Sequence, residues 1–175
     1  DFSSTLRTFL RQDPDVIMVG EIRDKETAEI SIRAALTGHL VFSTIHTNDS
    51  ASTITRLLDM DIEPFLVSSS VEGIVAQRLI RTLCTKCRKP VQYQEDFLKM
   101  HGFPLDKLND NKIIYEAVGC DECRDTGYRG RSGIFEILPI NDEIRPLIVS
   151  NASASSIKQV ALDQGMKTLR DDGWE

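Results

Sequence analysis

Four cysteines, placed as two pairs, have the spacing that is typical of metal binding. Cys84 and Cys87 form one Cys-x-x-Cys pair, and Cys120 and Cys123 form a second pair, with 32 residues between the two pairs. Two such pairs can bring four thiolates around one tetrahedral ion, and a filled Cys₄ set is the pattern of structural zinc because no position stays open for water. We therefore predict a Zn²⁺ site that supplies folding energy to this segment. An iron–sulfur or redox role is the alternative.

A glutamate and a histidine each follow an apolar run, at positions suited to nucleotide hydrolysis. Glu21 and its neighbour Gly20 come directly after Val16–Val19, and His46 ends the run that starts at Leu40. A carboxylate at such a position can orient or deprotonate an attacking water. An imidazole there can donate a hydrogen bond to a phosphate oxygen and report whether a γ-phosphate is present. An ordinary loop acid and a structural histidine are the alternatives.

Further polar residues accompany this pair. Thr44, Thr47 and Asn48 stand at the same strand end as His46, and we predict that Thr44 and Asn48 contact the nucleotide. Many nucleotide hydrolases have an aspartate that holds Mg²⁺ at the position of Gly20, so here Mg²⁺ would depend on phosphates, water and a phosphate-loop hydroxyl. Such a loop needs Gly-x-x-x-x-Gly-Lys-Ser/Thr, and none of the ten glycines fits that pattern. We expect the loop to lie upstream, and this stretch alone to be inactive.

The apolar pattern predicts the elements that would hold these groups. Residues 16–19 and 40–45 have the composition of buried strands, and the helix between them begins after an N-cap at Asp24 and ends at Gly38. Such a β-α-β unit makes the two strands parallel, and ligands then bind at the carboxyl ends of the strands. The carboxylate and the imidazole should therefore share one rim of the sheet.

The remaining elements follow from the same patterns. Helical spacing predicts a helix over residues 2–10, a short helix with Ile54 and Leu57 inward, and a longer one from Pro64 to near Leu83. Beyond that point the sequence becomes polar, and the further predicted elements are strands at 112–118 and 134–140 and helices at 142–150 and 155–164.

Composition limits the function classes. The chain has 175 residues, 41% of them hydrophobic, which predicts a packed globular protein of one or two domains. Its net charge is -6, with no long basic run, which argues against a dedicated nucleic-acid binder because phosphate contacts dominate that affinity. No apolar stretch reaches the roughly 18 residues that cross a bilayer. The chain starts at Asp1, without methionine, and we expect it to be a piece of a longer protein.

These motifs together resemble those of the type II secretion and type IV pilus assembly ATPases. Residues 10–28, which contain Gly-Glu-Ile-Arg-Asp at 20–24, resemble the variant Walker B region of that family, where glycine replaces the usual aspartate. Residues 37–48 resemble its histidine box, residues 76–84 its approach to the metal site, and residues 127–136 the stretch after its second cysteine pair. The resemblance covers the whole chain.

The resemblance implies an α/β fold in three parts. Residues 1–83 would be the C-terminal half of a RecA-like P-loop ATPase core, residues 84–123 a four-cysteine zinc subdomain, and residues 124–175 a small region of one strand and helices. Glu21 would be the catalytic carboxylate and His46 would face the phosphate. His39, which opens the second strand, would belong to the nucleotide-binding box.

The resemblance also implies a cellular role. The whole protein would be a cytoplasmic homohexamer at the inner membrane that hydrolyses ATP with Mg²⁺ and moves an inner-membrane platform protein, without nucleic acid. Assembly and secretion motors usually carry the four-cysteine insertion that retraction motors usually lack, which favours the former. A zinc-stabilised module that docks on the platform protein without chemistry is one alternative. A DNA-uptake or conjugation motor with the same core is the other.

Overall fold

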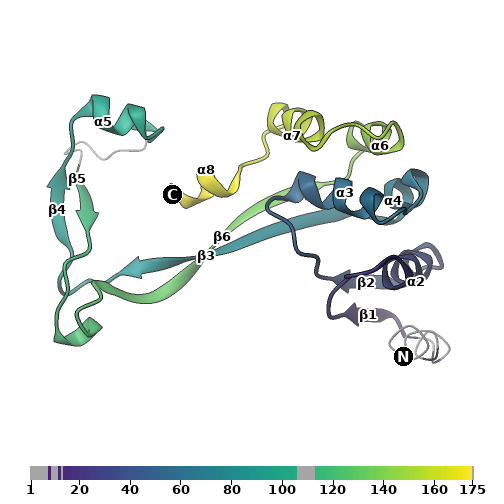
Figure 1. The fold of residues 1–175 in the computed structure, drawn as a ribbon, viewed down its shortest axis with the longest axis horizontal. Coiled ribbons are helices and arrows are strands. Elements are labelled where there is room, and N and C mark those ends of the chain that lie inside the picture. The colour runs from purple at the N-terminus through teal and green to yellow at the C-terminus, as the bar shows by residue number, and fades with distance from the viewer. Residues whose placement is uncertain (1–7, 9–11, 13, 106–112, 175) are drawn as a thin grey trace. The chain divides into compact units, whose positions relative to one another are not determined.

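The computed structural model describes residues 8, 12, 14–105 and 113–174. Its helices and strands, in chain order, are β1 (Val16–Val19), α2 (Lys25–Leu36), β2 (Leu40–Ser43), α3 (Ser50–Asp59), α4 (Pro64–Ser70), β3 (Gly73–Leu83), β4 (Lys89–Gln92), α5 (Glu95–Met100), β5 (Ile113–Glu116), the 3₁₀ turn η3 (Asp121–Cys123), β6 (Tyr128–Pro139), α6 (Ile144–Val149), α7 (Ala154–Asp163) and α8 (Leu169–Gly173) (Figure 1). The helix predicted over residues 2–10 lies, except for Thr8, outside the described residues.

The chain divides into two compact units. The first contains Asp1–Ala76 and Glu136–Lys167, and the second contains Gln77–Phe135 and Thr168–Glu175. Strands β3 and β6 pair with each other, and each of them contributes residues to both units. The three predicted domains stay a prediction, because a division by spatial contacts does not test where a functional subdomain begins.

The β-α-β unit predicted around Glu21 is present in the first unit. Strands β1 and β2 are parallel, with Val16 opposite Leu40 and Val19 opposite Ser43, and α2 connects them (Figure 1). The Asp24 carboxylate caps α2 by accepting a hydrogen bond from the amide of Thr27 at 2.8 Å. The shared direction of the strands brings both carboxyl ends to one edge of the sheet.

Among the residues that the structure describes, only one face of this small sheet is covered. Ile17 and Val19 are buried against α2, whereas Val16 and Met18 are 56% and 74% exposed. Leu40 and Phe42 of β2 are exposed as well. The prediction of fully buried strands is therefore wrong for the second face, because α2 is the element that packs on this sheet in the described part of the chain.

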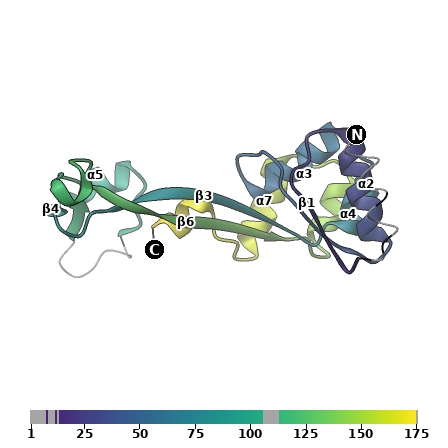
Figure 2. The same ribbon diagram turned by 90° about the horizontal axis from the view of Figure 1, so that it is seen from below.

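A larger core of the first unit lies among helices α2, α3, α4, α6 and α7 and the end of β6. Helices α3, α4, α6 and α7 pack against one another (Figures 1 and 2). The fully buried side chains at its centre are Ile54, Val67, Leu138, Ile144, Ile148 and Ile157. Full burial of such a side chain stabilises a fold by about 1.5–3 kcal/mol, so this core gives α3 a firm base.

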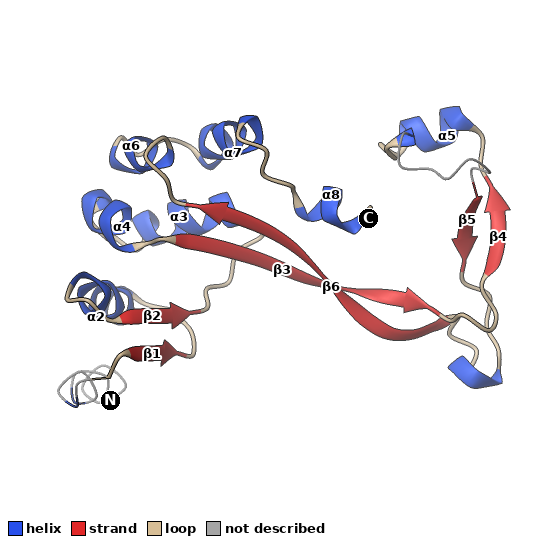
Figure 3. Ribbon diagram, turned by 180° about the vertical axis from the view of Figure 1, so that it is seen from behind, coloured by secondary structure: helices blue, strands red, loops and turns tan. Residues whose placement is uncertain are grey.

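The helix predicted from Pro64 to Leu83 is wrong beyond its first two turns. Helix α4 ends at Ser70, Val71 adopts an extended backbone, and β3 occupies Gly73–Leu83 (Figure 3). The β-branched residues of this segment favour a strand, and β6, which is distant in sequence, supplies the pairing partner. Val75 and Leu79, which the helical stripe placed inward, are each 60% exposed.

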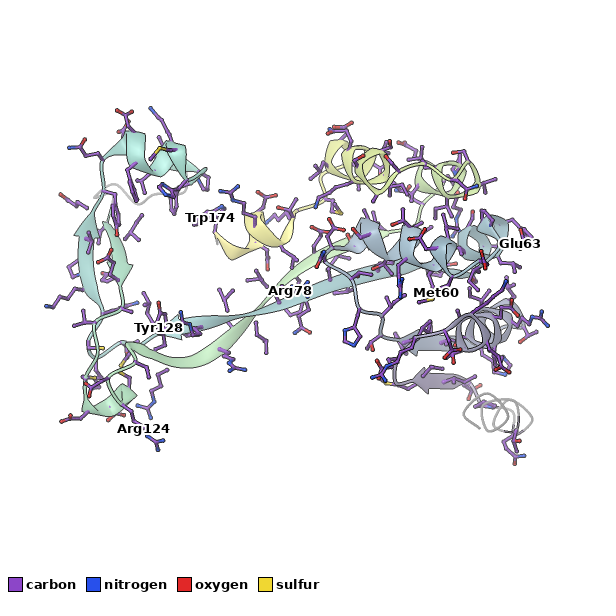
Figure 4. The ribbon with its side chains drawn as sticks, in the orientation of Figure 1. Met60, Glu63, Arg78, Arg124, Tyr128 and Trp174 are labelled. Atoms are coloured by element: carbon purple, nitrogen blue, oxygen red, sulfur yellow. The ribbon has the colours of Figure 1, made fainter. Side chains whose placement is uncertain are left out.

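The second unit contains an antiparallel hairpin and two short helices. Strand β4 pairs with β5, with Lys89 opposite Glu116 and Gln92 opposite Ile113. The strand predicted at 112–118 is confirmed over Ile113–Glu116, whereas β4 and α5 were not predicted. Trp174, next to α8, packs edge to face on Phe103 at a ring separation of 4.7 Å (Figure 4).

No helix of the described residues has the length and apolar character that a bilayer crossing requires.

Candidate nucleotide and metal sites

Two hydrogen bonds, one between backbone groups and one from a side chain, hold the rim of the β1–β2 sheet together beyond the strand ends. The amide of Ile22 donates to the carbonyl of Thr44 at 2.8 Å, and the Thr44 hydroxyl donates to the carbonyl of Gly20 at 2.7 Å. These bonds replace the ladder after Ser43, which explains why β2 stops two residues before the predicted end at residue 45. They fix the distance between the loop that carries Glu21 and the loop that carries His46.

Glu21 and His46 lie side by side on this rim, as their places in the sequence predict. His46 Nε2 is 3.4 Å from Glu21 Oε2, and the imidazole is 90% exposed. Arg23 Nε lies 2.7 Å from the same carboxylate oxygen. The structure therefore places an imidazole and a guanidinium against one carboxylate, and the imidazole is open to a ligand.

The electrostatics of the rim favour an ionised Glu21. The Arg23 guanidinium lowers the pKa of the Glu21 carboxyl most strongly, partial burial opposes that effect, and the nearby His46 adds to the lowering. The Glu21 carboxylate in turn raises the pKa of Arg23. The Glu21 side chain is 33% exposed although its Oε2 atom is buried, and the carboxyl is charged at neutral pH.

The other predicted nucleotide contacts have different positions. The Thr44 hydroxyl is engaged with the Gly20 carbonyl, so it supports the loop geometry in this state of the molecule. Asn48 is exposed two residues after His46. His39 precedes β2, at the end opposite His46, and its Nδ1 lies 3.0 Å from the carbonyl of Ala34 in α2. The roles assigned to these residues stay predictions.

Two charged residues of the first unit were not assigned a role in the sequence analysis. Arg23 belongs to the Gly-Glu-Ile-Arg-Asp motif but was not assigned a contact, and Glu136 is a 1% exposed glutamate inside β6. Strand alternation places Glu136 on the same side as Leu138, which is buried. A charge in a buried register was the available signal, because charges are rarely buried without partners.

The four cysteines form one cluster in the second unit. Their sulfur atoms all lie within 4.8 Å of one another, with separations of 4.0 Å for Cys84 and Cys120 and 3.8 Å for Cys87 and Cys123. Four sulfurs about 2.3 Å from a central zinc stand about 3.8 Å apart in a tetrahedron. The cluster therefore has the dimensions and the donor set of a closed structural metal site.

Backbone amides prepare this cluster for a cation. Burial raises the pKa of the Cys87 thiol to about 11. Burial acts on Cys123 in the same direction, but hydrogen bonds from the amides of Gly127 and Cys120, each at 3.2 Å, outweigh it and lower the pKa of Cys123 to about 7. Arg124, marked in Figure 4, follows η3 with a positive φ of 54° that directs the chain around the sulfurs.

Metal affinity of this cluster is expected to rise with pH. Cys87 holds its proton at neutral pH, and a bound metal must displace that proton because the thiolate is the ligand. Linkage then strengthens binding about tenfold per pH unit for each proton released. Competition with a chromophoric chelator between about pH 6 and pH 8 measures this slope. An affinity that does not change over this range would contradict the assignment.

Gly127 is expected to be essential for the shape of the cluster. Its φ is +74°, and a Cβ there would stand 2.7 Å from the Cβ of Ala117 and 3.0 Å from the amide nitrogen of Val118. Gly130 is a matched control because its φ is +86° and nothing lies within 4 Å of an added Cβ. Both alanine variants carry about 1–2 kcal/mol of backbone strain, so a greater loss of thermal stability and metal content in Gly127→Ala would isolate the clash. Equal losses would count against it.

Comparisons of sequence show which proteins the chain is similar to. Residues 1–175 match the model of the type II/IV secretion system protein family. The chain is 53% identical over 174 residues to the type IV pilus assembly ATPase PilB of Myxococcus xanthus, covering 99% of the chain and 31% of that relative. It is 48% identical over 172 residues to the type II secretion system ATPase E of Vibrio cholerae, covering 98% and 33%. The chain thus spans about a third of these relatives.

Solved structures give the same result for the fold. The pilus retraction motor PilT with bound ADP is similar at a TM-score of 0.56 and 30% identity, over 98% of the chain and 42% of that structure. The ATPase DotB of Legionella pneumophila has a TM-score of 0.61 at 23% identity, over 98% and 37%, which is a likeness of fold. The predicted fold class is confirmed: part of a RecA-like ATPase core, carrying four cysteines positioned to bind a metal.

Proposed function

Because the chain belongs to the type II/IV secretion system protein family, we propose that it is part of a motor that hydrolyses ATP to power type IV pilus assembly or type II secretion. Its relatives by sequence are ATPases of these two systems. The observation that carries the proposal is the 3.4 Å contact of Glu21 with His46. It supports a hydrolytic site at the carboxyl ends of two parallel strands, which is where α/β sheets bind ligands.

In the proposed mechanism Glu21 acts on the water that attacks the γ-phosphate. A carboxylate can orient that water and accept its proton, and Arg23 at 2.7 Å keeps Glu21 charged before the water arrives. The exposed His46 donates a hydrogen bond to a γ-phosphate oxygen. Stabilisation of charge on the transferring group is the main source of catalysis in phosphoryl transfer.

Nucleotide binding requires more than this stretch of chain. We propose that Asn48, Thr44 and His39 contribute to the nucleotide pocket, with Thr44 doing so through the loop geometry that it supports. When bound, Mg²⁺ neutralises charge on the phosphates. Gly20 offers no side-chain ligand for it, so the phosphates themselves and a phosphate loop from the longer parent protein would hold the ion. The 175 residues alone are then inactive.

We propose Zn²⁺ as the ion of the four-cysteine cluster. The sulfur separations of 3.8 to 4.0 Å support this choice, and a Cys₄ set leaves no position for water, so the ion has a structural role. The cluster lies between Leu83 at the end of β3 and Tyr128 at the start of β6, and its metal would close that connection. The subdomain then presents a surface of defined conformation that other components of the secretion or pilus assembly system can bind.

The setting of the whole protein is part of the proposal. It would be a cytoplasmic homohexamer, peripheral to the bacterial inner membrane, that acts on a membrane platform protein and has no nucleic-acid partner. The 53% identity to an assembly ATPase, against 30% to a retraction motor, supports assembly or secretion over retraction.

An ATPase assay on two lengths of the protein tests this function. The 175-residue chain should show no turnover, whereas a version extended upstream to include the phosphate loop should hydrolyse ATP. Both are measured by phosphate release, together with zinc content. An extended, folded, zinc-loaded protein that hydrolyses no nucleotide would refute the motor and favour an interaction module without chemistry.

A further inference from the structure

Glu136 is a buried charge that the proposed chemistry leaves unexplained. It lies in β6, within the first unit, and only 1% of its side chain is exposed. Burial of a carboxylate is costly unless partners satisfy it, and Glu136 belongs to the same strand face as the core residue Leu138. The partners of Glu136 therefore indicate which part of the structure this buried carboxylate stabilises.

The first partner is the beginning of α3. The amide of Ser50 donates to Glu136 Oε1 at 2.9 Å, and the Ser50 hydroxyl donates to the same oxygen at 2.5 Å. Ser50 is the first residue of α3, where backbone amides lack partners within the helix and where the helix dipole favours a negative charge. A glutamate 86 residues away in sequence thus holds the start of this helix.

The second partner is a lysine that joins Glu136 to the N-cap of the same helix. Lys158 Nζ of α7 lies 2.9 Å from Asp49 Oδ2 and 3.8 Å from Glu136 Oε2. The other Asp49 oxygen accepts from the amide of Ser52 at 2.9 Å, which completes the cap. One ammonium group therefore ties two carboxylates from distant parts of the chain to the first turn of α3.

This anchored turn is directly continuous with the loop that faces the phosphate. His46 precedes Asp49 by three residues, and within that interval the Thr47 hydroxyl bonds to the hydroxyl of Thr53 in α3 at 2.8 Å. The loop is consequently fixed at both ends, by Thr44 on the sheet and by the start of α3. Charge-assisted bonds are about twice as strong as neutral ones, so the Glu136 end is the firmer anchor.

We propose that Glu136 and Lys158 are positioning residues, which act through Asp49 and Ser50 to hold His46 at the distance from which it contacts the γ-phosphate. The inference rests on the proposed function. An ion pair whose carboxylate is buried in a packed core is suited to this task because it defines one geometry of the loop. Small displacements of a contact residue reduce its effect strongly.

The test is the preference of the full-length protein for ATP over ADP. Loss of a contact to the γ-phosphate lowers this preference, whereas a general loss of structure weakens the binding of both nucleotides. Glu136→Gln keeps the size of the side chain but removes its charge. We expect it to weaken a non-hydrolysable ATP analogue roughly tenfold and ADP by less than about twofold, the effect that a lost charged hydrogen bond produces. Fluorescence titration measures both.

A double-mutant cycle with His46→Ala assigns the effect to the histidine. If Glu136 acts through His46, adding Glu136→Gln to His46→Ala lowers the ratio of ATP affinity to ADP affinity no further. Glu143→Gln, an exposed glutamate after β6, is the matched control and should leave the ratio unchanged. Lys158→Met repeats the cycle at a partly exposed site, which keeps the test decisive should Glu136→Gln fail to fold.

Each outcome has a defined meaning. An unchanged ratio in folded Glu136→Gln and Lys158→Met, or effects that add to that of His46→Ala, would overturn the positioning role while leaving the motor intact. A wild-type protein that binds neither nucleotide would refute the proposed function, and the positioning role with it. A ratio that His46→Ala leaves unchanged would remove the phosphate contact itself and so overturn the inference.

Discussion

Replacing Glu21 with glutamine in the full-length protein is expected to leave ATP bound but to slow its hydrolysis by roughly 10²- to 10⁴-fold, the usual contribution of a general base. Glutamine has nearly the same shape, so the rim of the sheet keeps its geometry. Its neutral amide cannot accept a proton from water. The substitution also removes the ion pair with Arg23 at 2.7 Å, which in the native protein keeps the Glu21 carboxylate charged.

Three measurements decide this result. Phosphate release gives turnover, retention of labelled ATP gives binding, and thermal unfolding confirms that the variant is folded. Glu63→Gln is a suitable control because Glu63, marked in Figure 4, is an exposed residue before α4 whose side chain makes no cap hydrogen bond. Turnover at the wild-type rate in Glu21→Gln would refute the assignment. Loss of ATP binding together with turnover would show that Glu21 serves binding rather than the chemical step.

Replacing Cys84 with serine is expected to release the metal and to unfold the surrounding segment. Cys84 is 1% exposed and supplies one of four converging sulfurs. Structural zinc contributes about 10–16 kcal/mol of apparent binding free energy that is also folding free energy, and a serine hydroxyl is a poor replacement for a thiolate. The affected residues should be 84–127, because the Cys84 amide also donates to the carbonyl of Gly127 at 2.9 Å.

Zinc analysis and hydrogen exchange check this prediction separately. Metal content should fall from one ion per chain to near zero after dialysis against a mild chelator. Amide protection should be lost in residues 84–127 and retained in β1, α2 and β2, which belong to the first unit. Thr85→Ala, at an exposed position inside the first pair, is the control and should retain both. Unchanged zinc in Cys84→Ser would remove the Cys₄ site.

The sequence predicted correctly those elements whose local apolar pattern is sufficient to define them. The β-α-β unit, the Asp24 cap and helices α3, α6 and α7 are confirmed because the apolar pattern indicates these elements and the capping residue Asp24 marks the start of α2. The segment after Ser70 was misassigned because its apolar residues fit a helical stripe as well as a strand. Pairing with β6 decided between them, and the partner of a strand cannot be read from its own residues.

The sites divide in the same way. The four cysteines, and the closeness of Glu21 to His46, follow from spacing and from the direction of parallel strands, both of which are visible in sequence. Glu136 could not be assigned because its partners, Ser50 and Lys158, are far from it in the chain and meet only through tertiary packing. A buried glutamate in an apolar strand was a signal of some contact, but it did not identify the partner.

The uncovered side of the β1–β2 sheet has a practical consequence for handling this protein. Val16, Met18, Leu40 and Phe42 form an exposed apolar surface on a sheet that has two strands in the described part of the chain. A preparation that contains these residues without the rest of the longer parent protein should self-associate and should bind dyes that recognise exposed apolar surface. Extension of the protein with its upstream sequence, rather than a change of buffer, should prevent this self-association.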